Sequence, residues 1–278
     1  MCRWLAYSGE PLFIEDLVTQ PTHSLVKQSL DTRMNFSPAG NLWHTNGDGF
    51  GIGWYSIKEE PGLFKDERPA WNDENLHEIS SQIQTRAFLA HIRAATTAEV
   101  QRTNCHPFKY KSWLFQHNGH VSDFSVLRRD LQMEIAPELY PELKGNTDSE
   151  TLFLLALTYG LEDNPKEGLK RMVKRVQIAA REHNTSGQLN LSCALCDGNN
   201  LYTLRYAEKE EAMSQFYSSN LRSILDLQNR GDALPIKSVV VVSEPLTKLS
   251  ELWEEVPENS FTTIENGKVH IETFIEEG

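Results

Sequence analysis

Short segments that are apolar or that alternate apolar and polar residues dominate the first half of the chain and predict β-strands. Turn-forming residues bound these segments, which lie at 3–9, 50–57, 86–95 and 112–121. The last third returns to the same pattern at 189–206, 236–246 and 260–274. The final pair of strands is expected to turn at Asn266-Gly267, because this dipeptide is favoured in two-residue β-hairpin turns.

Helical spacing of apolar residues fills the region between these two groups of strands. Helices are expected at 122–132, 147–161 and 165–183. Ser122-Asp123 is a start signal for the first, and Thr147 or Asp148 can cap the second, with Glu150 in its first turn. Strands and helices in separate blocks, joined by hairpins, predict an α+β fold with antiparallel sheets.

Length, charge and the distribution of apolar residues limit the classes of protein to which the chain can belong. The 278 residues suffice for an ample core, and without an internal repeat or linker-like run we expect one domain over residues 2–278. The net charge of −12 argues against a nucleic-acid partner, because such partners require clustered Lys and Arg. The longest apolar stretch, 152–161, is too short to cross a bilayer, and no positively charged leader precedes a long apolar run. We therefore expect a cytoplasmic protein with no membrane partner.

The four cysteines are Cys2, Cys105, Cys193 and Cys196. Cys193 and Cys196 form a lone C-x-x-C, whereas a zinc site needs four ligands at recognisable spacings. We interpret this pair as small buried residues in a strand, and we expect no metal site.

Cys2 has two interpretations. Removal of Met1 would leave a thiol and a free α-amine on one residue, and an α-amine with a pKa near 8 can accept and return a proton. A nucleophile and its base on one residue suit acyl transfer. The alternative is a small apolar residue at the start of an edge strand.

Three further segments carry candidate chemistry. Asn118-Gly119 is either a turn or an oxyanion hole that combines a side-chain amide with a backbone N–H. Arg93, in an otherwise apolar strand, is either paired internally or a planar fork for a carboxylate. Asp148 is either a helix cap or a partner for a substrate ammonium. The glycine-rich stretch 46–54 lacks the phosphate-loop pattern and is interpreted as a tight turn into a closely packed strand.

Taken in chain order, Cys2, HIRAAT (91–96), HNG (117–119) and TDSE (147–150) resemble the motifs of the class II glutamine amidotransferases. These enzymes belong to the N-terminal-nucleophile hydrolase superfamily. The resemblance implies the fold of that superfamily, a four-layer αββα sandwich with two stacked, mainly antiparallel β-sheets. It also implies a set of roles: nucleophile for Cys2, oxyanion hole for Asn118 and Gly119, substrate α-carboxylate for Arg93, α-ammonium for Asp148, and a place beside the substrate for Thr96. No metal or organic cofactor is implied.

Other segments resemble the stand-alone subgroup of this class, which lacks a synthase domain. They are MCRWLAYSG (1–9), PTHSLVKQSLDTR (21–33), NGDGFGIGWY (46–55), NCHPF (104–108) and SEPLT (243–247). NCHPF resembles a loop near the active site, and Cys105 is given no catalytic role. One departure is Thr97, which stands where many amidotransferases have a histidine.

The leading hypothesis is hydrolysis of a γ-glutamyl amide by the Cys2 thiol. The substrate would be glutamine or a larger γ-glutamyl compound, and any acceptor of the ammonia would be a separate protein. The alternative is a catalytically silent γ-glutamyl-binding or regulatory subunit of a larger complex. Retention of Met1 would favour this alternative, because a peptide-bonded Cys2 nitrogen cannot act as the base.

Overall fold

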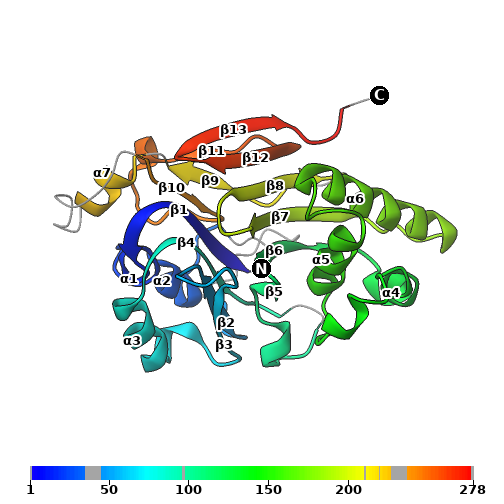
Figure 1. Ribbon diagram of the computed structural model, residues 1–278, viewed down its shortest axis with the longest axis horizontal. Helices are drawn as coiled ribbons and strands as arrows, with labels where there is room; N and C mark the ends of the chain where they lie inside the picture. The colour runs from blue at the N-terminus through cyan, green and yellow to red at the C-terminus, as the bar shows by residue number, and fades with distance from the viewer. Residues whose placement is uncertain are drawn as a thin grey trace.

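The computed structural model describes residues 2–34, 45–95, 98–209, 211–218, 220–226 and 237–276. Two β-sheets stack on each other, and helices cover the outer face of each (Figure 1). This is the four-layer αββα arrangement with antiparallel sheets that was expected. The α+β prediction is therefore confirmed.

The first sheet holds seven strands within the described residues, in the order β11-β9-β10-β1-β4-β2-β3. β1 (Arg3–Phe13) lies between β10 (Val239–Val242) and β4 (Gln84–Ile92) and is antiparallel to both. The remaining strands are β2 (Phe50–Trp54), β3 (Gly62–Asp66), β9 (Phe216–Ser218) and β11 (Glu254–Glu255).

The second sheet holds six strands within the same ranges, in the order β13-β12-β8-β7-β6-β5. Its strands are β5 (Phe108–Tyr110), β6 (Trp113–Val121), β7 (Leu189–Cys196), β8 (Leu201–Ala207), β12 (Ser260–Glu265) and β13 (Lys268–Thr273). Asn266 and Gly267 join the last two strands with φ values of 50° and 75°. Positive φ at both positions is what a type I′ turn requires, so the predicted hairpin is confirmed.

Helices pack on both outer faces, and on the first sheet they are joined by Leu221, Ile224 and Leu225 of a later helix. α1 (Glu15–Val18), α2 (Leu25–Leu30) and α3 (Glu74–Gln82) cover the first sheet. The second sheet is covered by α4 (Phe124–Met133), α5 (Asp148–Thr158) and α6 (Pro165–Glu182). The remaining elements are α7 (Leu221–Asp226) and the 3₁₀ helices η1 (Ala70–Asn72), η2 (Arg102–Asn104), η3 (Tyr140–Glu142) and η5 (Ser250–Leu252). Among the described helices none has the length and apolarity to cross a membrane.

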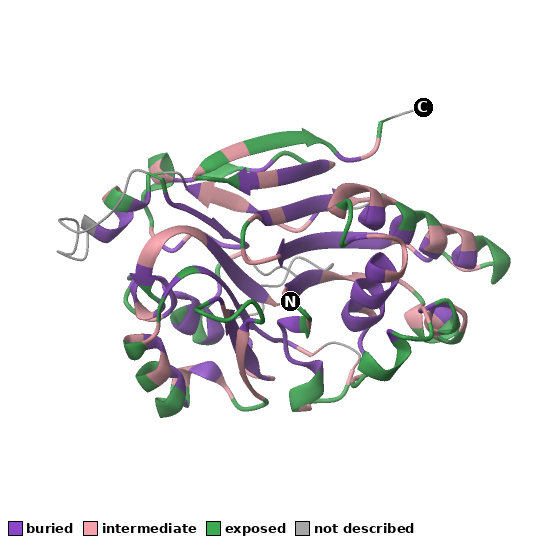
Figure 2. Ribbon diagram, viewed as in Figure 1, coloured by how far each residue is buried: buried purple, intermediate pink, exposed green. Residues whose placement is uncertain are grey.

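The alternation of β1 explains how the layers are held together. Leu5 and Tyr7 pack toward α1–α3, whereas Trp4 and Ala6 pack between the two sheets. Successive side chains of a strand point to opposite faces, so one strand serves both apolar layers. Figure 2 shows the resulting band of buried residues along β1 and the neighbouring strands. Cys2 precedes this strand directly and is therefore held at the end of a buried element.

Two local expectations were wrong in detail. Asp123 occupies the N-cap position of α4, but its carboxylate accepts hydrogen bonds from the backbone and hydroxyl of Ser186. β4 ends at Ile92, so Arg93 belongs to the loop after the strand. The capping prediction for α5 is confirmed for Thr147, whose hydroxyl accepts from the backbone N–H of Glu150 at 3.2 Å.

The C-x-x-C pair behaves as small buried residues. Cys193 packs with the helix-covered core and Cys196 with the core between the sheets, so their side chains lie on opposite faces of β7. Burial raises the pKa of both thiols, that of Cys196 to about 12. Thiols on opposite faces of one strand cannot share a metal ion, so the interpretation as buried residues is confirmed.

Candidate active site

One cavity of about 60 Å³ collects the candidate residues that the structure describes. Its lining residues are Cys2, Arg93, Ala94, Ala95, Ala98, His106, His117, Asn118, Gly119, Thr147, Asp148 and Ser149. They come from the residue before β1, the loop after β4, the segment between η2 and β5, the second half of β6 and the start of α5. Thr96 and Thr97 lie outside the described residues. The cavity therefore lies between the two sheets at the end where β1 begins.

Cys2 is half-buried and is placed by the pairing of β1 with β4. Arg3 is opposite Ile92 in this pairing, which brings the thiol of Cys2 to the loop that follows β4. The backbone N–H of Ala94 donates to Cys2 Sγ at 3.5 Å, and Sγ lies 3.7 Å from the Ala94 carbonyl oxygen. A backbone donor to sulfur stabilises negative charge on it, which suits a nucleophilic thiol.

Arg93 is buried, and both the glycine-rich turn and the loop that follows Arg93 hold it. Its Nη1 donates to the carbonyl of Asp48 at 3.4 Å and its Nη2 to that of Ala98 at 3.2 Å. Its own backbone N–H donates to the Gly49 carbonyl at 2.8 Å. The Asp48 carboxylate in turn accepts from the backbone N–H of Ala95 at 2.8 Å. Sequence reasoning missed Asp48; its position in the turn before β2 was the available signal.

The same glycine-rich stretch packs closely against its neighbours, as expected. A Cβ atom at Gly51 would lie 2.2 Å from the His106 carbonyl oxygen. Gly49 has a φ of 117°, a conformation that favours glycine. The interpretation as a tight turn into a closely packed strand is confirmed.

Asn118 and Gly119 lie inside β6, opposite Ser192 and Leu191 of β7, so the interpretation as a turn was wrong. Asn118 is 1% exposed, and its Nδ2 is a buried donor without a hydrogen-bond partner in the described part of the chain. Buried donors are nearly always paired, and an unpaired one in a cavity is free to bind a ligand. Gly119 has a φ of 150°, and a Cβ atom there would lie 1.9 Å from the Asn190 carbonyl oxygen. This position therefore requires glycine.

Asp148 opens α5, but the residue that caps the helix is Thr147. The Asp148 carboxylate reaches back to β6, where its Oδ2 accepts from the Val121 N–H at 3.0 Å. Its Oδ1 accepts from the Ser149 N–H at 2.7 Å. Capping therefore does not account for Asp148, which is held instead as an acidic side chain at the cavity wall.

Two buried histidines, His106 and His117, line the cavity, and a third, His91, packs behind them. His117 Nδ1 lies 2.9 Å from Ser149 Oγ, and its Nε2 lies 3.2 Å from the Asn190 carbonyl oxygen. The rings of His91 and His106 pack 4.2 Å apart, and both ring nitrogens of His106 lack hydrogen-bond partners within the described ranges. Burial lowers the pKa of all three imidazoles. They are therefore neutral at pH 7. Sequence reasoning left His106 without a role, although it lines the cavity.

Cys105 differs from Cys2 in its surroundings. Its thiol lies 3.3 Å from the Asp66 carbonyl and 3.6 Å from the Gln101 carbonyl. Burial raises the pKa of this thiol to about 11. Nucleophilic attack requires the thiolate, so burial disfavours the reactive form of Cys105. Nowhere in the described ranges do three or more His, Cys, Asp or Glu residues form a group that could hold a metal ion.

Comparison with known sequences gives a consistent set of relatives. The family model for class II glutamine amidotransferases matches residues 17–277. "Probable glutamine amidotransferase DUG3" of Saccharomyces cerevisiae is 32% identical over 307 residues, covering 100% of this chain and 85% of that one. The γ-glutamyl-hercynylcysteine sulfoxide hydrolase of Mycolicibacterium smegmatis is 30% identical over 122 residues, 44% of this chain and 52% of that one.

Solved structures agree with the sequence relatives. A glutamine aminotransferase class-II domain protein from Silicibacter pomeroyi superposes with a TM-score of 0.72 at 32% identity, covering 99% of this chain and 100% of that one. Glutamine phosphoribosylpyrophosphate amidotransferase from B. subtilis gives a TM-score of 0.65 at 14% identity, covering 99% and 50%. The second likeness shows the fold alone.

Proposed function

The chain belongs to the class II glutamine amidotransferases, and from this premise we propose that it hydrolyses γ-glutamyl amides with the Cys2 thiol as nucleophile. The observation that carries the proposal is the buried Nδ2 of Asn118, which has no hydrogen-bond partner among the described residues and lies in the cavity that Cys2 also lines. Such a donor is costly to bury unless a ligand or transition state uses it. An oxyanion formed at the attacked carbonyl is a partner of this kind.

Arg93 and Asp148 would bind the two ends of the glutamyl group. Arg93 carries five N–H donors, and the carbonyls of Asp48 and Ala98 orient its guanidinium group. The rest of its fork suits the substrate α-carboxylate, which it would bind in a planar geometry. The Asp148 carboxylate, oriented by the N–H groups of Val121 and Ser149, suits the α-ammonium. Thr96 stays a prediction for a place beside the substrate.

The reaction requires a free α-amine on Cys2, and therefore removal of Met1. This amine accepts the thiol proton, directly or through a water, and sulfur attacks the γ-carbonyl carbon. The negative charge that develops on the carbonyl oxygen is stabilised by the Asn118 side chain and the Gly119 N–H. The ammonium on Cys2 then protonates the leaving nitrogen as the C–N bond breaks. Water hydrolyses the resulting thioester, which releases glutamate and regenerates the thiol.

The leaving group defines two versions of this activity. We propose that residues 2–278 form a single glutaminase domain. With glutamine the leaving group is ammonia, and we propose that a separate protein accepts it. With a larger γ-glutamyl compound it is an amine. The Mycolicibacterium smegmatis relative is by its name a hydrolase of a γ-glutamyl compound, which supports including this second class.

The test measures glutamate release from glutamine and from a panel of γ-glutamyl peptides, with protein shown by intact mass to begin at Cys2. Cys2→Ala should reduce release by more than about 10³-fold, because loss of a nucleophile removes the covalent route. Cys105→Ala is the matched control and should retain activity. Unchanged release in Cys2→Ala would refute the mechanism. Binding of γ-glutamyl compounds without release in the wild-type chain would favour a silent binding subunit.

A further inference from the structure

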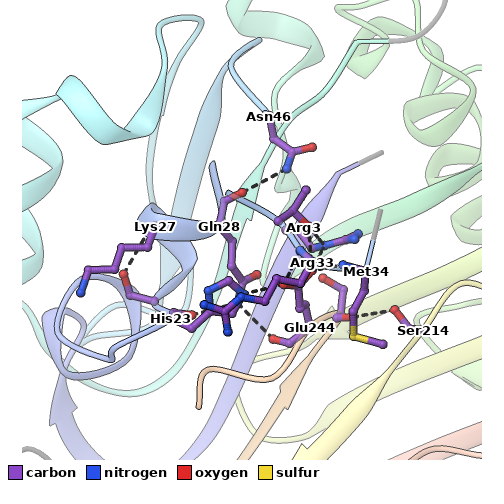
Figure 3. Close-up of polar contacts among 12 residues, drawn as sticks. Arg3, His23, Lys27, Gln28, Arg33, Met34, Asn46, Ser214 and Glu244 are labelled. Atoms are coloured by element: carbon purple, nitrogen blue, oxygen red, sulfur yellow. Dashed lines mark hydrogen bonds and ion pairs between the residues drawn. The ribbon is translucent and has the colours of Figure 1, made fainter. Parts of the chain in front are cut away.

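A buried ionic cluster lies beside the first residues of β1, outside the cavity described above. We call it the Glu244 cluster; its members are Arg3, His23, Thr32 and Glu244. Each has at most 3% of its surface exposed. Figure 3 shows Arg3, His23 and Arg33 gathered around Glu244, which lies in the loop after β10.

Five donors converge on the Glu244 carboxylate. Oε2 accepts from Arg3 Nε at 2.8 Å, Thr32 Oγ1 at 2.7 Å and the Met34 N–H at 3.1 Å. Oε1 lies 2.5 Å from His23 Nε2 and accepts from the Arg33 N–H at 2.9 Å. Burial opposes ionisation, but the bond to His23 and the charge of Arg3 outweigh it and lower the pKa of Glu244 to about 2. Glu244 is thus a fixed negative charge at neutral pH.

Arg3 connects this cluster to the nucleophile. While its Nε is bound to Glu244, its Nη1 donates to the Cys2 carbonyl oxygen at 2.8 Å. The carbonyl carbon, the α-amino nitrogen and the Cβ of Cys2 are all bonded to one Cα. A held carbonyl therefore restricts the backbone torsion that orients both the thiol and the amine.

Ser243, the residue before Glu244, is hydrogen-bonded to the backbone of Trp4 in β1. Ser243 Oγ accepts from the Trp4 N–H at 2.9 Å, and the Ser243 N–H donates to the Trp4 carbonyl at 3.0 Å. Gln28 of α2 fixes the loop itself by donating to the Glu244 carbonyl at 3.2 Å. Chain ends fray unless they are tied down, and these contacts tie residues 2–4 to the 243–244 loop.

Stability alone is a weak reason for such a cluster. Desolvation of a buried ion pair offsets most of its attraction, and well-packed apolar residues serve stability as well or better. In the Glu244 cluster, by contrast, the charged guanidinium group of Arg3 donates a hydrogen bond to the main-chain carbonyl of Cys2. This contact is specific to the site.

We propose that Glu244 is a positioning residue for Cys2, which acts through Arg3; this inference rests on the proposed function of Cys2. Glu244 and Thr32 hold the Arg3 guanidinium, and Arg3 holds the Cys2 carbonyl, so that the thiol points toward the space in front of Asn118 and Gly119. Arg93 and Asp148, the proposed substrate ligands, have no contact with this link among the bonds of the described residues.

The experiment compares Glu244→Gln, Arg3→Met and the double variant with the wild-type chain, all confirmed to begin at Cys2. Kinetics with glutamine, or with the best γ-glutamyl peptide of the panel, give kcat and KM. Alkylation by iodoacetamide reports thiol reactivity without turnover. It reports on Cys2 because the other three cysteines are buried.

We expect kcat and the alkylation rate to fall roughly 10- to 100-fold in each single variant, because small displacements of a reacting group have effects of this size. KM should stay within about threefold. The double variant should be no slower than Arg3→Met alone, because both changes break one link. Losses that multiply in the double variant would overturn the proposal, as would wild-type kcat in Glu244→Gln.

Two further variants separate positioning from folding. Arg3→Lys keeps the charge beside Glu244 but loses the fork, so it should fold normally and still show reduced kcat and alkylation. Arg205→Met removes an equally buried guanidinium that bonds to Glu255 and Val256. It should lower the melting temperature and leave alkylation unchanged. Equal slowing of alkylation in Arg205→Met would reject the positioning role.

The two proposals can fail separately. If no γ-glutamyl amide is hydrolysed but Glu244→Gln still slows alkylation, the proposed function fails and the positioning role stands. If Cys2-dependent hydrolysis is found and Glu244→Gln alters neither readout, the positioning role fails and the proposed function stands.

Discussion

The two walls of the cavity are built in different ways. Asn118 and Gly119 occupy interior positions of β6, where backbone pairing with β7 sets their geometry. Cys2 and Arg93 lie beyond the ends of β1 and β4, and distant groups hold them: Asp48 for the Arg93 loop, Ser243 and Glu244 for the start of β1. After their proposed roles we call the side with Asn118 and Gly119 the oxyanion wall and the side with Cys2 and Arg93 the nucleophile wall. Local strand structure sets the first, and long-range contacts set the second. Remote substitutions should therefore disturb the nucleophile wall more.

Among the variants that compare the two walls, the largest effect is expected at Asn118. Asn118→Ala should lower kcat by roughly 10²- to 10³-fold, because one oxyanion donor contributes about 3–4 kcal/mol to the barrier. KM should change little, and so should the melting temperature, because Nδ2 has no partner among the described residues that would be lost. Steady-state kinetics and thermal unfolding measure both. A raised KM with unchanged kcat would place Asn118 in ground-state binding instead.

On the nucleophile wall, Arg93→Lys should act on substrate binding. Loss of the planar fork should raise KM roughly 10- to 100-fold, since a hydrogen bond to a charged group contributes about 1.5–3 kcal/mol. The matched control is Arg86→Lys on β4, the strand that precedes the Arg93 loop; the Arg86 side chain is 68% exposed and pairs with Glu10. Kinetics over a range of glutamine concentrations compare the two. An unchanged KM in Arg93→Lys would remove Arg93 from the substrate site.

A smaller effect on kcat is expected from a substitution in the apolar layer between the two sheets. Leu114 packs between the two sheets, and Leu127 of α4 packs in the core between the second sheet and its helices. The variants Leu114→Ala and Leu127→Ala each truncate a fully buried leucine. Both should lower the free energy of unfolding by about 2–5 kcal/mol. Only Leu114→Ala should also lower kcat, by several-fold, because the reacting groups come from opposite sheets. Urea unfolding and kinetics well below both melting temperatures test this difference. Equal loss of kcat in both variants would contradict it.

The smallest effect is expected at Cys105. Its thiol is buried and its pKa is raised to about 11, so Cys105→Ala should keep kcat within about twofold. Iodoacetamide should modify one thiol per native chain in both the wild type and the variant. Mass spectrometry counts the modified sites, and loss of the single modification in Cys105→Ala would assign the reactive thiol to Cys105.

Local patterns were sufficient for much of the fold. The strands around Leu5 and Val121, the Asn266-Gly267 hairpin and the Thr147 cap follow from alternation, turn residues and a capping hydroxyl, all of which act within a few residues. The helices α1–α3 were missed. The longest of them, α3, has only nine residues, and such short helices owe their stability to packing on the sheet.

For the candidate site, too, some features followed from the sequence and others only from the tertiary structure. The chain by itself determined which residue types carry the chemistry: a thiol at position 2, an amide beside a glycine, an arginine after an apolar strand and an acid at a helix start. Tertiary structure decided that these residues meet in one cavity and that the Cys105 thiol is buried. It also decided that Glu244 reaches Arg3 across almost the whole chain. Burial, pairing and long-range hydrogen bonds arise only once the two sheets stack, because each needs groups that are distant in sequence.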